Sequence, residues 1–116
     1  MITDKCKESI VEMLDAEITQ GALGVSNNAP QASDTGLISE ITSTRQSITG
    51  AVSGKQLTIT YNLNSVTGND ETYYEYGDFM TNGITTSEVM LNRIVFTGVP
   101  KNSALEFQVT NIINVP

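Results

Sequence analysis

The sequence predicts a mainly β fold: an antiparallel β-sandwich or partial barrel of about five strands, with one N-terminal α-helix. Three observations predict it. The stretch Leu57–Leu63 alternates apolar and polar side chains, which is typical of a strand with one face on a core and the other in water. Turn residues recur at short intervals through the second half of the chain. The chain also holds 15 Thr, 10 Ser and 10 Asn, which favour turns and sheet faces over helix interiors.

A chain of 116 residues is long enough for one domain with one modest core. We therefore expect a single domain over 1–116, with a helix over 3–19, a loop over 20–38 and a β-domain over 39–116. Trp is absent, so the core must be built mainly from Ile, Val, Leu and three Phe.

The predicted helix runs from Thr3 to about Thr19, with Thr3 or Asp4 as its N-cap. Its apolar residues recur every four positions and form one stripe, which is amphipathic spacing. We expect this stripe to pack on the sheet or on a copy of the helix, and Cys6 to be a small buried apolar side chain. The stripe consists of Cys6, Ile10, Leu14 and Ile18, with Val11 and Met13 beside it.

The segment Gly21–Leu37 shows no periodicity and is rich in Gly, Asn, Ser, Pro and Asp, which indicates an irregular connection. An unstructured connection of this length inside a small domain is usually functional or docked on something.

Five strand-like runs follow, joined by short turns. Asn82-Gly83 is the strongest hairpin signal among these turns. Such spacing predicts an antiparallel meander. The predicted strands are about Ser39–Val52, Leu57–Val66, Glu71–Met80, Glu88–Thr97 and Leu105–Val115.

Composition argues against several classes of function. The formal net charge is −7 and no run of Lys or Arg is present, so nucleic acid is not an expected partner. With no His and a single Cys, the common catalytic triads, zinc sites and disulfides are not expected, and we predict no metal or cofactor. No signal peptide or apolar stretch of spanning length is seen, so membrane is not an expected partner and synthesis in a cytoplasm is the default.

The densest acidic group comprises Asp70, Glu71, Glu75 and Asp78. We interpret these residues as solvated turn and strand acids. Calcium binding and acid–base catalysis stay open as alternatives, although the spacing does not match an EF-hand loop. Arg45 and Arg93 are expected to be structural, with Glu40 or Glu88 as cross-sheet partners.

Tyr73, Tyr74 and Tyr76 allow two interpretations. Exposed rings would form a platform for a sugar or a protein, because aromatic side chains present rigid amphipathic area. The structural alternative places Tyr74 and Tyr76 on the core and Tyr73 at an edge.

Four segments in their order resemble a known family. The chain resembles small virion proteins encoded among the tail and structural genes of tailed bacteriophages. The similarity extends over nearly the whole chain, although each motif is loose and none carries chemistry. The segments are Ala29–Leu37 (APQASDTGL), Arg45–Thr49 (RQSIT), Thr72–Phe79 (TYYEYGDF) and Met90–Thr97 (MLNRIVFT).

The resemblance implies a non-enzymatic, multicopy structural protein of a virion, made in the host cytoplasm, at the tail, baseplate, neck or fibre attachment. The alternatives are a capsid decoration protein and a β module that binds carbohydrate or a host surface, in which case a host glycan is the partner. The expected partners are otherwise other virion proteins and copies of the chain.

We predict the interface from the loop and the helix, because so long a loop needs neighbouring subunits to order it. The predicted interface residues are Ile10, Leu14, Ile18, Val25, Asn27, Asn28, Pro30, Tyr73 and Tyr76.

Overall fold

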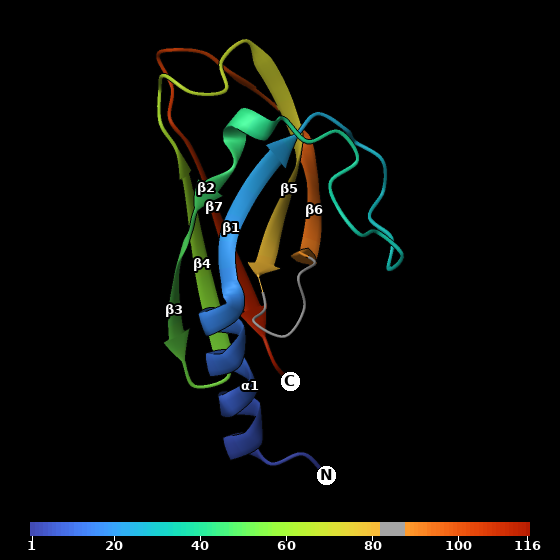
Figure 1. Ribbon diagram of the computed structural model, residues 1–116, viewed down its shortest axis with the longest axis vertical. Helices are drawn as coiled ribbons and strands as arrows, with labels where there is room; N and C mark the ends of the chain where they lie inside the picture. The colour runs from blue at the N-terminus through green and yellow to red at the C-terminus, as the bar shows by residue number, and fades with distance from the viewer. Residues whose placement is uncertain (82–87) are drawn as a thin grey trace.

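The computed structural model describes residues 1–81 and 88–116 of an elongated molecule of 48 × 27 × 27 Å (Figure 1). The one α-helix of these residues lies at one end, below two β-sheets that face each other. The elements are α1 (Asp4–Glu17), β1 (Ile18–Gly24), a 3-10 turn η1 (Thr42–Thr44), β2 (Gln46–Ser47), β3 (Thr49–Ser53), β4 (Gln56–Leu63), β5 (Glu71–Thr81), β6 (Glu88–Lys101) and β7 (Phe107–Asn114).

The predicted fold class is confirmed: the protein is mainly β, with two antiparallel sheets and an N-terminal helix. One sheet has four strands in the order β2-β1-β5-β6, and the other has three in the order β3-β4-β7. The described strands number seven, more than the five expected, and β1 lies between β2 and β5, so the simple meander was wrong.

Helix α1 begins where the sequence predicts. The Thr3 side chain accepts a hydrogen bond from the Cys6 amide at 3.3 Å, which confirms Thr3 as the N-cap. The helix ends at Glu17, two residues early, and the chain passes directly into β1. Val11 is fully buried, but Cys6 and Met13 are exposed, so the expectation that Cys6 is buried was wrong.

Strand β1 replaces the start of the predicted loop, and its glycines explain why. A Cβ at Gly21 would lie 2.8 Å from the ring of Tyr61 and from the hydroxyl of Tyr76, and one at Gly24 would overlap the Glu75 side chain. The glycines therefore let the strand pack closely against these residues, a role that glycine commonly has inside strands.

Strand β4 is the centre of its sheet, as the alternation predicts. Leu57, Ile59, Tyr61 and Leu63 are buried and the residues between them are not. It pairs with β3 and β7 in regular antiparallel register.

The other boundaries differ from prediction in detail. The expected strand Ser39–Val52 is divided into η1, β2 and β3. Strand β6 continues through the expected turn to Lys101, so β7 starts only at Phe107. The Asn82-Gly83 hairpin lies outside the described residues.

The core has two parts. The larger part lies between the sheets, and the smaller part lies under α1 and consists of Val11, Ile18, Leu57 and Ile59. The larger part consists of Leu23, Tyr61, Leu63, Tyr73, Tyr76 and Phe107. No helix among the described residues is long and apolar enough to cross a membrane.

Candidate functional site: a surface loop held by buried charges

The most unusual feature of the surface is the loop 25–39, which leaves the end of β1 and projects beyond β6 (Figure 1). Two backbone hydrogen bonds close its base: the Val25 amide donates to the Ser39 carbonyl, and the Ile41 amide to the Leu23 carbonyl, both at 3.0 Å. Between these points the loop has no regular structure, so side chains of the sheet must hold it.

The Glu75 carboxylate, on β5, holds the base of the loop. Its Oε1 accepts from the Ile38 amide at 3.0 Å, and its Oε2 accepts from the Ser26 amide at 3.2 Å and the Ser39 amide at 2.9 Å. One carboxylate therefore binds backbone groups from both arms of the loop.

Arg93, on β6, neutralises this carboxylate. Its Nε donates to Glu75 Oε1 at 2.8 Å, and the two side chains are 1% and 0% exposed. Burial alone would raise the pKa of the Glu75 carboxyl, but the Arg93 guanidinium and the three backbone amides outweigh it and hold the pKa below its ordinary value. Glu75 is therefore an ionised, fully paired carboxylate at neutral pH.

Arg93 also reaches the outer part of the loop. Its Nη1 donates to the Asn28 carbonyl at 2.9 Å and lies 3.4 Å from an Asp34 carboxylate oxygen. Its Nη2 is buried and has no hydrogen-bond acceptor among the described residues. Beside this arginine, the loop and β6 enclose a pocket of about 270 Å³, lined by Pro30, Gln31, Ala32, Asp34, Met90, Leu91, Asn92 and Arg93.

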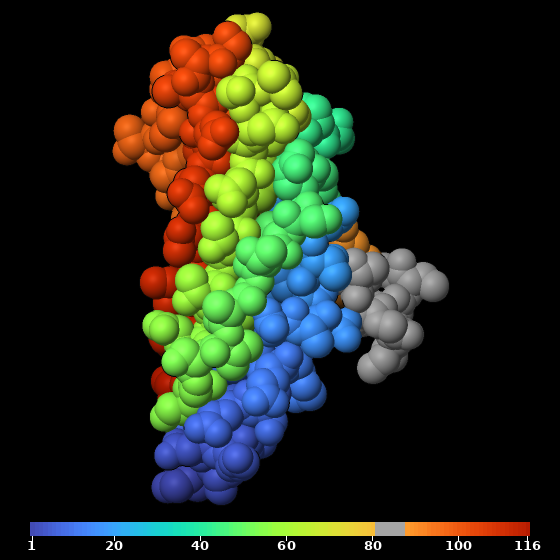
Figure 2. Space-filling view, turned by 90° about the vertical axis from the view of Figure 1, so that its left-hand side faces the viewer, coloured from blue at the N-terminus to red at the C-terminus, as the bar shows by residue number. Residues whose placement is uncertain are grey.

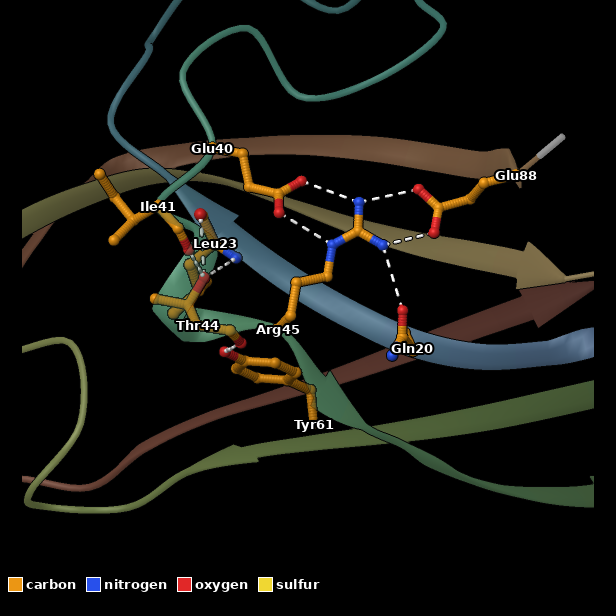
Figure 3. A network of polar contacts seen from close by, with 8 residues as sticks. All are labelled: Gln20, Leu23, Glu40, Ile41, Thr44, Arg45, Tyr61 and Glu88. Atoms are coloured by element: carbon orange, nitrogen blue, oxygen red, sulfur yellow. Dashed lines mark hydrogen bonds and ion pairs between the residues drawn. The ribbon is translucent and has the colours of Figure 1, made fainter.

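A second arginine holds the end of the loop (Figure 3). Arg45 forms two hydrogen bonds to the Glu40 carboxylate, at 2.8 and 2.9 Å, and two to the Glu88 carboxylate, at 2.6 and 2.8 Å. It also donates to Gln20 on β1, and its guanidinium lies 3.8 Å from the centre of the Phe79 ring. The predicted pairing of Arg45 with Glu40 or Glu88 is confirmed, and both acids take part.

Thr44 fixes the turn that precedes Arg45. Its hydroxyl accepts from the Leu23 amide at 2.9 Å and lies 2.6 Å from the Ile41 carbonyl, and its own carbonyl accepts from the Tyr61 hydroxyl (Figure 3). Burial raises the pKa of Tyr61, so this hydroxyl stays a donor.

The predicted interface residues of the loop lie at its surface. Asn27, Asn28 and Pro30 are exposed, while Val25 packs against the core at the base. The contacts that order the loop come from its own chain, through Glu75 and Arg93, so the argument that neighbouring subunits must order it was wrong. Whether these exposed residues meet another chain stays a prediction.

The predicted helical interface residues are largely covered. Ile18 belongs to β1 and is buried, and Leu14 packs on the core under the helix. Ile10 is half-buried. Most of this stripe therefore faces its own sheet.

Tyr73 and Tyr76 have no exposed surface, so an exposed tyrosine platform was wrong for both. A register irregularity between Tyr73 and Glu75 places both rings in the core between the sheets. Tyr73 therefore does not pack at an edge, as the structural alternative proposed, and Tyr74 is half-buried.

The acids were also interpreted wrongly in part, because Glu75 and Asp78 are fully buried. Asp78 accepts hydrogen bonds from the Tyr76 hydroxyl and from Asn111 on β7, which links the two sheets. Burial raises the pKa of the Asp78 carboxyl, although these hydrogen bonds partly oppose the change. Among the described residues, no three His, Cys, Asp or Glu side chains are placed to hold a metal ion.

Three of the four segments that carry the family resemblance meet at this site. Asp34 comes from the first segment, Glu75 from the third and Arg93 from the fourth. Arg45, from the remaining segment, holds Glu40 just after the loop. Comparison of the chain with models of known families gives no match, and comparison with curated proteins gives no relative.

Proposed function

We propose that this chain is a non-enzymatic structural protein of a tailed virus particle, present in several copies at the tail, baseplate, neck or fibre attachment. In this role the loop 25–39 is a contact surface for other virion proteins. A position on the capsid surface, as a decoration protein, would use the same loop.

One observation carries the proposal: the segments that resemble virion proteins converge on holding an exposed loop. Glu75, Arg93 and Asp34 come from three such segments and make one connected set of charged contacts. Ion pairs as buried as Glu75–Arg93 contribute little net stability, so their value lies more in fixing one arrangement. A rigid loop binds a partner with a smaller entropic cost than a flexible loop does, which suits an assembly surface.

The experiment measures incorporation into particles. Asn27 and Gln31 are exposed on the loop, so Asn27→Lys/Gln31→Lys changes its charge without touching Glu75 or Arg93. Asn102→Lys/Ser103→Lys is the matched control, since it adds the same charges to the exposed turn between β6 and β7. Because the chain is acidic, we expect a basic partner surface, which added lysines would repel.

Mass spectrometry of purified particles should find the original chain and the control in stoichiometric amounts with capsid and tail proteins, and the loop variant depleted at least about tenfold. Circular dichroism should show that both variants fold. Particles that lack the original chain, or a loop variant incorporated as well as the control, would refute the proposal.

The pocket beside Arg93 favours a second candidate function, the binding of a small carbohydrate. A buried guanidinium N–H without an acceptor and the side chains of Asp34 and Asn92 are groups that hydroxyls satisfy. The pocket of about 270 Å³ suits a monosaccharide better than a longer ligand. An NMR titration with a panel of monosaccharides should shift resonances of Gln31 and Asn92, and an absence of shifts across the panel would exclude this candidate.

A further inference from the structure

The three-stranded sheet differs from the rest of the protein in its charge. Its strands β3, β4 and β7 contain no Asp, Glu, Lys or Arg, in a chain with 19 charged residues. The four-stranded sheet, by contrast, carries charged residues on both β5 and β6. Figure 2 views the uncharged sheet, with β7 in red along one margin and β4 beside it.

Among the described residues the two sheets have four edge strands, and three of them are guarded against pairing with another chain. Strand β2 has only two residues, and β6 carries Pro100 and pairs irregularly with β5. Strand β3 lies against α1, whose Asp15 fills the space beside Gly50. Short strands, prolines, irregular pairing and nearby charges are the usual protections of a sheet edge.

Strand β7 has none of these protections within its own length. All eight of its residues pair with β4 in unbroken register, and they include no proline and no charge. Its outward side chains are uncharged and exposed, and Ile112 is 53% exposed. An open, regular and apolar edge of this kind is where an added strand binds.

An apolar groove adjoins this edge. It has a volume of about 300 Å³ and is lined by residues of β6, from one sheet, and of β7, from the other. Phe96 and Phe107 line it with ring centres 6.1 Å apart, and Val99, which also lines it, is exposed. A strand added beside β7 would cover the groove as well as complete the backbone hydrogen bonds of the edge.

We propose that β7 pairs antiparallel with β7 of a second copy of this chain, which joins two three-stranded sheets into one of six strands. Charge argues for a second copy as the occupant. With a net charge of −7, two copies repel over most of their surface, but at β7 they meet without a like-charge pair. The pairing is two-fold symmetric, so β7 of each copy lies beside the groove of the other.

The pairing specifies how copies of the chain meet and does not depend on whether they meet in a virus particle. Its test therefore needs only the purified protein. Sedimentation equilibrium should find a dimer, and Ile112→Lys should raise the dissociation constant at least about 100-fold, because both lysines then lie on the same face near the symmetry axis and repel each other. Val52→Lys is the matched control: it places the same charge on an exposed β-branched position of β3, the other edge of the sheet.

Spin labels give a second measurement that does not rely on a destabilising charge. In a Cys6→Ser background, labels on Thr110→Cys should interact strongly, because Thr110 lies near the symmetry axis. Labels on Ala51→Cys should be about 24 Å apart, since five strand spacings separate β3 from its copy. A monomer at every concentration tested, a dimer that Val52→Lys weakens as much as Ile112→Lys, or a closer pair of labels at Ala51 than at Thr110 would overturn the proposal.

Discussion

Replacing Glu75 with glutamine is the sharpest test of how the loop is held. The carboxylate accepts four hydrogen bonds, two on each oxygen, from Arg93 and Ile38 and from Ser26 and Ser39. In Glu75→Gln, one oxygen becomes an NH₂ group, which donates, so two of these donors lose their acceptor. The Arg93 charge also loses its buried counter-charge.

The expected loss follows from these two effects. Removing one partner of a buried ion pair costs about 3–5 kcal/mol, and each buried donor without an acceptor costs about 1–3 kcal/mol. The cost of breaking the ion pair already includes the donors that it leaves unpaired, so the two costs overlap and do not add. We expect the free energy of unfolding to fall by about 3–5 kcal/mol, a large part of the ~5–15 kcal/mol of a small domain. The loss of unfolding free energy cannot exceed the cost of detaching the loop from the sheet, because detachment lets water pair with these donors.

Urea denaturation measures the loss, and hydrogen exchange locates it. The amides of Ser26, Ile38 and Ser39 should exchange faster in the variant, because Glu75 is their acceptor. Glu106→Gln is the matched control, since Glu106 is exposed and makes the same chemical change. A variant within about 1 kcal/mol of the original protein, with unchanged exchange at these amides, would refute the reasoning.

The pH dependence supplies an independent signature. The folded-state pKa of Glu75 is lowered, so its contribution to stability is present above the unfolded-state pKa near 4.3 and is lost as the pH falls through the folded-state value. Glu75→Gln should remove this part of the acid destabilisation, whereas Glu106→Gln should leave it intact.

Three further outcomes are expected. Ile59→Asp should prevent cooperative folding, because Ile59 is buried in β4, whereas Asn62→Asp on the exposed face should melt normally; thermal unfolding compares them. Arg45→Lys should lower the free energy of unfolding in urea by about 1–2 kcal/mol, since lysine cannot bind two carboxylates in a fork, and Lys55→Gln, which breaks only an exposed pair, by less than about 0.5 kcal/mol. Asp78 has a raised pKa, so its contribution to stability is greatest below pH ~4 and declines as the pH rises; Asp78→Asn should flatten this decline in a series of unfolding measurements at rising pH.

The local features of the fold could be predicted from the sequence, because local patterns determine them. The alternation in β4 reflects one face on the core, and the cap at Thr3 requires only an amide three residues later. The partners of Arg45 could be predicted because the chain has only six basic residues, and because Glu40 and Glu88 are among the few acids at the starts of predicted strands.

Strand β1 could not be predicted, because its glycines are required by contacts with residues that are distant in the sequence. Gly24 pairs with Glu75, and its missing side chain leaves the space that the carboxylate fills on its way to the loop. Read locally, the same glycines indicate a turn. The role of Gly24 depends on Glu75, which is 51 positions away, and a single sequence does not reveal that the two residues are neighbours.

The burial of Glu75 and Asp78 was missed for a related reason. Asp78 lies on the core face of β5 with Tyr76, and Glu75 lies on the opposite face, which the loop 25–39 covers. The partners that make burial tolerable are also distant: Arg93 for Glu75, and Asn111 for Asp78. One local signal was available, since both acids sit among residues of strong β propensity in a run that reads as a strand.

The division of charge between the two sheets follows from what each is proposed to do. A sheet that holds an irregular loop must satisfy the loop's unpaired backbone groups, and charged side chains such as Glu75 and Arg93 do this with the fewest residues. A sheet that pairs with its own copy must avoid like charges at the symmetry axis, which every charged side chain on β7 would introduce. Mixing the two requirements in one sheet would place a charge near the axis or leave loop amides without acceptors. Their separation into β5–β6 and β7 therefore allows both surfaces in a chain of 116 residues.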